Sequence, residues 1–503
     1  MRRCNLEPQR HPSIGMLMEL DMKMSRSQNR AVSAALFAAY TAALCAMLAG
    51  CNVGPKYVPP AMTAPSAYKE SPGQFKESEG WKVAEPQDAT LRGKWWEIYN
   101  EPDLNALEEQ LNIDNQNIRE AFENFMEARA LVREARSQLF PTLSVGPSYT
   151  RSQNSSNVSL GGGGSSGSAG GGSASGQQTQ VFSLPGEVSW EPDLWGKVRN
   201  TIHSSQFSAQ VSAADLANER LTEQASLAEY FFEIRGQDAL QTILDAAVDA
   251  DKRSLDAEQG RYDTGVDDQI SLVEAQTNLA SAQSAAINNK IARAQFEHAI
   301  ALLIGKPASE FSVPVVAKTT EPPPIPVGLP SQLLERRPDV AAAERTMASA
   351  NAQIGVAYAA YYPALTISGS GGAESSAIGK LLAAASRFWS VGPSLSETIY
   401  DGGLRRATVN QYIATYNADL AAYRQSVLTA FQQVEDAMAE VRILSDQIRR
   451  QQEAVDHSAT YVKLEQTRYD TGIDPYIDLV LAQNTSYSSQ EGLANLQIQQ
   501  MSA

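Results

Sequence analysis

The sequence predicts a mainly α-helical chain made of two structural repeats, each of which includes one β-hairpin. Residues 258–276 resemble residues 465–483, and the pentapeptide Arg-Tyr-Asp-Thr-Gly begins at Arg261 and again, 207 residues later, at Arg468. A shared pentapeptide inside a longer similarity indicates a duplication. In each half, the apolar periodicity also changes from helical to alternating and back to helical.

The composition argues against several classes of protein. The 503 residues carry a net charge of −16, whereas nucleic-acid binding requires clustered lysine and arginine. The chain has three cysteines and four histidines, with no CxxC and no HExxH motif. We therefore expect no metal site and no cofactor. No catalytic constellation is recognisable, so we expect no catalytic residues and no enzymatic activity.

Residues 1–50 are predicted to be a signal peptide, with Met24 as the true start of the chain. Arg26 and Arg30 precede the apolar run 31–50. A basic segment followed by such a run is the layout of a secretory signal rather than of a membrane span.

The apolar run ends in Leu-Ala-Gly before Cys51, which resembles a bacterial lipobox and predicts that Cys51 is lipidated. An ordinary signal peptide followed by a chance cysteine is the alternative. Asn52 stands where an aspartate would retain a lipoprotein at the inner membrane, which implies the outer membrane. Residues 51–90 are rich in proline and polar residues, so we expect a lipidated, extended tether.

The first repeat is expected over residues 91–311. A helix is predicted from Asp103 to about Gln138, ended by Pro141. A β-hairpin is expected over 141–191, because two segments of strictly alternating apolar and small polar residues flank a Gly/Ser-rich loop.

A helical hairpin completes the first repeat. Its first helix begins after Trp195 and Gly196, with Gly236 as a candidate break, and its tip lies near residue 265. The return helix is expected to end near Leu303, before a Gly-Lys-Pro sequence.

The second repeat is expected over residues 331–503, after a stiff Pro-rich crossover at 312–330. It again predicts a helix, a β-hairpin at 363–401 and a helical hairpin with its tip near 472. The long helix carries an apolar stripe with steps of three and four, as in a coiled coil, although a generic helical core gives the same pattern. The stripe is Tyr412, Tyr416, Leu420, Tyr423, Val427, Phe431, Val434, Met438 and Val441.

The repeated turns contain the signals of a helix end followed by a helix start. Gly265 and Gly472 suit the left-handed position just after a helix. Asp267 and Asp474 are expected to be the N-caps of the next helices. The last helix is expected to be about ten residues shorter than its counterpart, because the 207-residue offset would place the equivalent of Lys306 beyond Ala503.

Strands with one apolar and one small polar face suit a membrane barrel, whose outside contacts lipid. Four strands cannot close around a channel, and open sheet edges are excluded from lipid. The chain is therefore expected to oligomerise, and three copies would supply twelve strands. The helix between Gly403 and Gly472 would span roughly 100 Å if continuous, which predicts helices that extend into the periplasm.

Taken together, these motifs resemble TolC-type outer-membrane efflux factors, of the NodT-like lipoprotein branch that serves resistance-nodulation-division pumps. The resemblance rests on Cys51, the Trp95-Trp96 segment, the strand exits Leu194-Trp195-Gly196 and Asp401-Gly402-Gly403, the segment 329–340 and both repeated turns. It implies a homotrimer with a twelve-stranded β-barrel continued by a twelve-helix periplasmic α-barrel. It also implies a passive conduit for drugs or other small molecules, coupled to a periplasmic adaptor and an inner-membrane pump.

The resemblance also implies that the chain is gated at the helical tips, where the adaptor makes contact. The candidate gate residues are Asp478 and, second, Glu274. A solvated carboxylate on the first turn of a helix is the alternative for Asp478. Leu481 departs from the family, which often has a second acid there. The expected tip residues are Arg261, Tyr262, Thr264, Gly265, Asp267, Arg468, Tyr469, Thr471, Gly472 and Asp474.

Two other functions would use part of this pattern. A non-conducting periplasmic adaptor lipoprotein would explain Cys51 and the coiled coils, but not two membrane-type hairpins. A structural coiled-coil lipoprotein of the envelope would predict no strands.

Overall fold

The computed structural model describes residues 52–60, 69, 93–153, 178–317, 322–323 and 336–503. The predicted signal peptide, Cys51, most of the tether, the Gly/Ser-rich loop and much of the Pro-rich crossover lie outside these ranges. The chain forms two compact units. One comprises Met1–Lys56, Arg133–Ser204 and Asn351–Ile413, and the other comprises Tyr57–Val132, Ser205–Ala350 and Ala414–Ala503. Each unit therefore draws on both sequence repeats.

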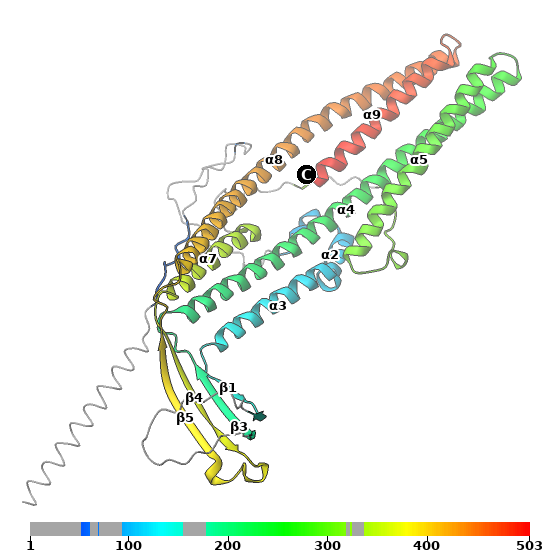
Figure 1. The fold of residues 1–503 in the computed structure, drawn as a ribbon. Helices are drawn as coiled ribbons and strands as arrows, with labels where there is room; N and C mark the ends of the chain where they lie inside the picture. Colours follow the sequence, from blue (N-terminus) through cyan, green and yellow to red (C-terminus); the bar gives the residue numbers. More distant parts are fainter. Residues whose placement is uncertain (1–51, 61–68, 70–92, 154–177, 318–321, 324–335) are drawn as a thin grey trace, which may run out of the picture. The chain divides into compact units, whose positions relative to one another are not determined.

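The first unit contains an antiparallel sheet in which the two repeats pair through β3 and β4 (Figure 1). Its order is β1-β3-β4-β5, and β2 also pairs with β3. β1 and β2 keep one register along β3 and are separated only at Gly146 and Pro147, because proline has no N–H to donate to the ladder. The strands are β1 (Thr142–Val145), β2 (Ser148–Gln153), β3 (Gln178–Trp190), β4 (Ala364–Ser375) and β5 (Arg387–Ser396).

The two faces of the sheet differ in chemistry, as the alternation predicts. One row across the strands is Leu143, Val188, Gly369 and Val391. The next row is Ser144, Glu187, Ser370 and Ser390, and the hydroxyls of Ser370 and Ser390 lie 2.8 Å apart. Large apolar side chains, including Leu143, Val391 and Trp389, are exposed on the first face.

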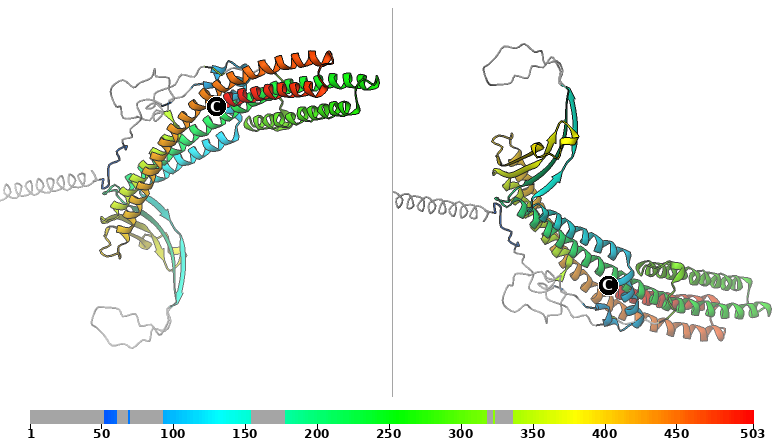
Figure 2. Two further views of the ribbon diagram at one scale, coloured as in Figure 1. Left: turned by 90° about the horizontal axis from the view of Figure 1, so that it is seen from above. Right: turned by 90° about the horizontal axis from the view of Figure 1, so that it is seen from below.

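Two helical hairpins, α4–α5 and α8–α9, dominate the second unit and run side by side (Figures 1 and 2). None of the helices in the described ranges has an apolar stretch long enough to cross a membrane. The helices are η1 (Trp95–Tyr99), α2 (Pro102–Asp114), α3 (Gln116–Ser137), α4 (Lys197–Asp263), α5 (Gln269–Leu303), η2 (Ala308–Glu310), α7 (Pro338–Ala359), η3 (Ile378–Lys380), η4 (Ala384–Ser386), α8 (Leu404–Asp470) and α9 (Tyr476–Ser502).

Two helix predictions were wrong. The helix expected from Asp103 to Gln138 is interrupted at Asn115, whose side chain accepts a hydrogen bond from the Ile118 N–H at 2.9 Å and so starts α3. The candidate break at Gly236 is absent, since α4 is continuous there. A Cβ on Gly236 would overlap Ile498 of α9, so this glycine permits close packing of two helices.

The main core of the second unit joins α2, α4 and α5. Leu104, Leu111, Leu227, Phe231, Ile234, Ile300 and Ile304 are almost completely buried in it. The apolar stripe predicted on α8 lies on the less exposed side of that helix, with Tyr423 and Val427 buried and the other members half-buried.

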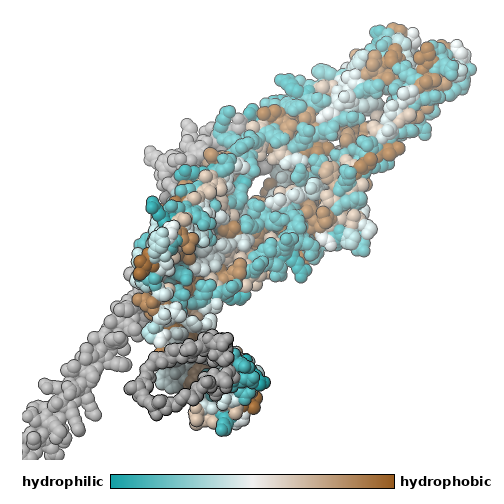
Figure 3. Space-filling model, in the orientation of Figure 1, coloured by the Kyte–Doolittle hydropathy of each residue, from teal (hydrophilic) through white to brown (hydrophobic). Residues whose placement is uncertain are grey.

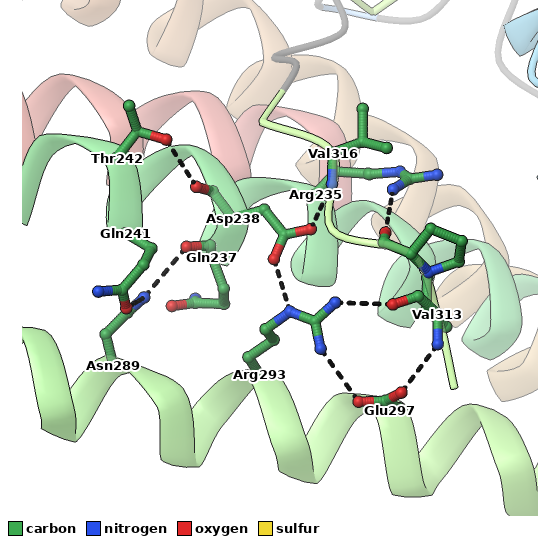
Figure 4. A network of polar contacts seen from close by, with 11 residues as sticks. Arg235, Gln237, Asp238, Gln241, Thr242, Asn289, Arg293, Glu297, Val313 and Val316 are labelled. Carbon is green, nitrogen blue, oxygen red and sulfur yellow. Dashed lines mark hydrogen bonds and ion pairs between the residues drawn. The ribbon is translucent and has the colours of Figure 1, made fainter. Parts of the chain in front are cut away.

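A polar network fixes the segment after α5 to the first helical hairpin (Figure 4). Arg293 Nε donates to Asp238 Oδ1 at 2.6 Å, and Arg293 also donates to the Val313 carbonyl at 2.8 Å. Asp238 is 2% exposed, and its second oxygen accepts from the Val316 N–H. The second repeat replaces this ion pair with a neutral bond of 2.7 Å from Gln500 to Ser445.

Asp238→Ala is expected to lower the free energy of unfolding by about 2–3 kcal/mol, because the Val316 N–H and one side of the Arg293 guanidinium lose their buried acceptor. Glu297 stays paired with Arg293. The matched control is Ser445→Ala, at the equivalent position of the second repeat, which should cost about 1 kcal/mol or less. Denaturant unfolding in detergent, followed by helical circular dichroism, measures both. Equal losses in the two variants would contradict the assigned role of Asp238.

Candidate functional site at the tips of the helical hairpins

The two repeated turns have the same backbone conformation. Gly265 and Gly472 have φ values of +73° and +71°, so both occupy the predicted left-handed position. The Gly265 N–H donates to the Tyr262 carbonyl and the Val266 N–H to the Arg261 carbonyl, both at 2.9 Å. These two bonds define a Schellman motif, and the second turn repeats them. Thr264 and Thr471 add hydroxyl bonds to the last carbonyls of the helices.

The prediction that Asp267 and Asp474 are N-caps was wrong. Asp268 caps α5, accepting from the N–H groups of Ile270 and Ser271. Pro475 occupies the cap position of α9 and provides no side-chain bond. The two aspartates pair instead with the arginine of their own turn. Arg261 Nε lies 3.3 Å from Asp267 Oδ2, and Arg468 Nη2 donates to Asp474 Oδ1 at 2.8 Å.

A buried carboxylate joins the two hairpins at their tips. Glu258 of α4 accepts a hydrogen bond from the Tyr469 hydroxyl of α8. The Arg261 guanidinium lies 4.9 Å from the centre of the Tyr469 ring, a distance suited to a cation–π contact. Tyr469 also packs in an apolar cluster with Tyr476, Leu479, Val480 and Ala275. The first hairpin thus holds the second through Tyr469.

The environment shifts several pKa values at this site. Burial raises the pKa of Glu258, although the Tyr469 hydroxyl acts in the opposite direction. Burial and the Glu258 carboxylate raise the pKa of Tyr469, and burial raises that of Tyr476 to about 12. The Arg468 guanidinium lowers the pKa of Asp474. Burial and the Asp474 carboxylate raise the pKa of Glu465, to which Asp478 adds a smaller effect.

Glu258 and Glu465 were missed as functional candidates by the sequence analysis. They are the first residues of the two similar segments and lie 207 residues apart, which is the signal that could have identified them. Their contacts, however, could not be read from it, because Tyr469 reaches Glu258 from a different hairpin.

The predicted gate residues lie beside these clusters. Asp478 is half-buried on the first turn of α9 and is close enough to Glu465 and Arg468 to affect their pKa values. Glu274 is half-buried on the second turn of α5. Cys51, the predicted lipidation site, lies outside the described residues. In the described part of the chain, no three potential metal ligands form a cluster.

Comparison with known proteins identifies the family. The model of the outer membrane efflux protein family matches residues 107–306 and 329–503. The chain belongs to this family. It is 30% identical over 468 residues to the solvent efflux pump outer membrane protein SrpC of Pseudomonas putida, covering 91% of this chain and 94% of that protein. It is 28% identical to nodulation protein T of Rhizobium leguminosarum bv. trifolii, covering 89% and 91%.

The solved structures agree with this membership of the outer membrane efflux protein family. The outer-membrane channel OprN superposes with a TM-score of 0.78 at 25% identity, covering 90% of this chain and 97% of that one. The MtrE channel of Neisseria gonorrhoeae has the same fold, with a TM-score of 0.73 at 23% identity, covering 90% and 96%. The resemblance found in the sequence is confirmed. The family is one of efflux proteins and not of enzymes, and it favours neither the adaptor nor the structural coiled coil.

The raised pKa of Glu258 leads to a pH-dependent stability at the tip. A carboxyl group whose folded pKa exceeds its ordinary value of 4.5 binds more protons folded than unfolded. The folded tip therefore gains stability as the pH falls toward 4.5. The Glu258→Gln variant lacks this gain in stability, because its side chain has no carboxyl group to protonate. Asp267 has a lowered pKa, so its contribution is lost only as the pH falls below its ordinary value of 3.8.

Thermal unfolding of the parent chain and of Glu258→Gln from about pH 7 to about pH 5 tests this linkage. We expect the parent to gain stability relative to the variant as the pH falls. A difference that is constant, or that changes in the opposite direction, would show that the Glu258 carboxyl is not held in its neutral form by the folded tip.

Proposed function

We propose that this protein is the outer-membrane channel of a tripartite efflux system and acts as a passive conduit to the exterior. Three copies form a closed barrel from their sheets and a tunnel from their helical hairpins. The observation that carries the proposal is the exposed apolar face of the sheet, bearing Leu143, Val391 and Trp389 opposite a face of serines. Such a sheet suits a wall between lipid and water.

The proposed partners are a periplasmic adaptor and an inner-membrane resistance-nodulation-division pump. Both tips expose large apolar side chains, namely Val266, Ile270 and Ile473. Figure 3 shows hydrophobic residues among hydrophilic ones near the tips. Exposed apolar side chains beside two turns of the same backbone conformation suit docking of another protein. Adaptor contact is proposed for these side chains and for the exposed turn residues Thr264, Gly265, Thr471 and Gly472, but not for Tyr469, which is 7% exposed and bonded to Glu258.

The cargo is proposed to be small molecules, including drugs. SrpC is named for solvent efflux, and a second Pseudomonas putida relative, TtgI, for toluene efflux. The small polar face of the sheet offers few groups that would select one solute over another, so selection is assigned to the pump.

Asp478, with Glu274 second, is proposed to line the constriction at the closed tips. In a trimer each position would contribute three carboxylates. A ring of carboxylates attracts cations, and it resists full ionisation through mutual repulsion. Opening would be a movement of the hairpins relative to one another, driven by contact with the adaptor.

Conductance in planar lipid bilayers tests the channel and its gate. We expect the purified protein to form pores of low closed-state conductance. Asp478→Ala should raise that conductance or weaken block by multivalent cations, because it removes the carboxylate ring. Asp456→Ala, which removes an exposed carboxylate from the same hairpin, is the matched control. Absence of any pore would overturn the proposed function, and identical behaviour of the two variants would remove Asp478 from the gate.

Cys51 is proposed to carry the lipid that anchors the mature protein in the outer membrane, and residues 1–50 are proposed to be removed. Cys51→Ser should abolish fatty-acid labelling in growing cells and the mass increment of the mature N-terminus. Incorporation of a labelled fatty acid into the protein reports the first, and mass spectrometry of the purified protein reports the second. A mature N-terminus at another residue, or a labelled Cys51→Ser protein, would contradict the assignment.

A further inference from the structure

The two repeats differ in which of their equivalent residues are covered. Several apolar residues of the second repeat are buried, whereas the residues 207 positions earlier are exposed. The exposed fractions are 7% for Tyr469 against 41% for Tyr262, 5% for Val480 against 49% for Val273, 7% for Ala494 against 65% for Ile287, and 8% for Ile498 against 56% for Ile291.

The buried members are covered by the first hairpin. Tyr469 donates to Glu258 of α4, Ile498 lies against Gly236 of α4, and Val480 shares a cluster with Ala275 of α5. One face of the second hairpin is therefore packed on the first. The corresponding face of α5, which carries Val273, Ile287 and Ile291, is exposed and has no such cover from the residues that the structure describes.

The face of the second hairpin that should cover it is also open. Glu465, the equivalent of Glu258, lies half-buried on α8, with its Oε2 3.9 Å from Arg468 Nε, and no tyrosine among the described residues donates to it as Tyr469 donates to Glu258. Tyr461 and Ile443 on α8 are 42% and 53% exposed. Tyr461 and Ile443 stand 207 positions after Ser254 and Gly236, which contact Tyr476 and Ile498 of α9, respectively.

We propose that α8 of a second copy of this chain covers α5 in the register that α4 uses to cover α9, and that Tyr262 donates a hydrogen bond to the partner's Glu465. The proposal deepens the proposed trimeric channel and rests on it. It assigns a specific pair of residues to the contact between copies, where the partner completes the hydrogen bonding of a carboxylate.

The atomic pattern around each glutamate supports the equivalence. Arg261 pairs with Asp267 beside Glu258, and Arg468 pairs with Asp474 beside Glu465. Among the described residues, no tyrosine hydroxyl bonds to Glu465 as Tyr469 bonds to Glu258, and Tyr262 is the residue that the repeat places there. Its exposed ring would lie under the partner's Arg468, as the Tyr469 ring lies under Arg261.

The shape of α5 also suits a neighbouring helix. A shallow, open depression lies along it from Val273 to Asn288, lined in part by Ala280, Ser281, Ser284 and Ala285. Small side chains at this spacing let two helices approach closely. Toward Ile291 the contact must differ from its counterpart, because Ile443 stands where the first repeat has Gly236, so the two helices are spaced further apart there.

Cysteine cross-linking tests the contact and its register. Ile291→Cys and Ile443→Cys are combined in the full-length chain, which is treated in detergent with a short bis-maleimide. We expect covalent dimers and trimers of the chain. The matched control combines Ile291→Cys with Leu464→Cys, an exposed residue of the same helix that lies about 31 Å further along it. For this control pair, we expect no more covalent product than the parent chain gives.

Efficient cross-linking through position 464, or none through either position in a chain that is trimeric by light scattering, would overturn the proposed contact and leave the channel intact. A chain that is monomeric by light scattering and forms no pore would instead refute the proposed function.

A tyrosine-specific readout tests the hydrogen bond. Tyr262→Phe should increase the fraction of dissociated chains several-fold at a fixed detergent concentration, whereas Tyr262→Phe combined with Glu465→Gln should add little further effect. Tyr469→Phe, which breaks the equivalent bond within the chain, should not change dissociation to the same extent. Dissociation that is unchanged in Tyr262→Phe, or additive in the double variant, would remove the Tyr262–Glu465 pair from the interface.

Discussion

The two repeats bind each other through different surfaces, and this constraint governs the rest of the structure. In the second unit, α4 of the first repeat covers the second hairpin through Glu258 and Gly236. In the first unit, β3 of the first repeat pairs with β4 of the second. A heterologous contact joins two different surfaces, so each partner keeps one surface unused. Successive contacts use all of these surfaces only when the copies close into a ring. Among the described residues, β1, β2 and β5 each pair on one side only, and Val273, Ile287 and Ile291 of α5 are exposed, so the sheet and the helices both leave a surface for a further copy.

The locally determined parts of this fold could be predicted from the sequence. Alternation located the strands, and Gly265 and Gly472 fixed the ends of the long helices, because a left-handed residue is needed there and glycine adopts it at little cost. Prediction failed where distant residues compete for a group. Asp267 and Asp474 have the chemistry of helix caps, but an arginine six residues earlier in each turn binds them instead.

The missed features share one cause, which is packing between segments far apart in the chain. Gly236 suggests a helix break by its propensity, yet the helix continues, because the missing side chain makes room for Ile498. Asn115 looks like an ordinary polar residue on a helix. Its amide also bonds to Glu223 and to the Leu303 carbonyl, at 3.1 and 2.8 Å, and these contacts fix the interruption between α2 and α3. Glu258 likewise acquires its role only when Tyr469 arrives from the second hairpin.

The distribution of charge at the tips separates what holds each hairpin from what holds the two together. Opposite charges are paired within a hairpin, Arg261 with Asp267 and Arg468 with Asp474. Between the hairpins, the polar contacts at the tip include the Tyr469 hydroxyl on the Glu258 carboxylate, the Arg261 guanidinium over the Tyr469 ring, and a hydrogen bond between Tyr476 and Ser254. Separating the hairpins at their tips would break these polar contacts and would also expose the apolar cluster of Tyr469, Tyr476, Leu479, Val480 and Ala275. The ion pairs and the Schellman turns would stay intact, so each hairpin could move as a rigid element. Binding of another protein to the exposed tip residues could offset the loss of these contacts, whereas each ion pair lies within a single turn and is not broken when the hairpins separate.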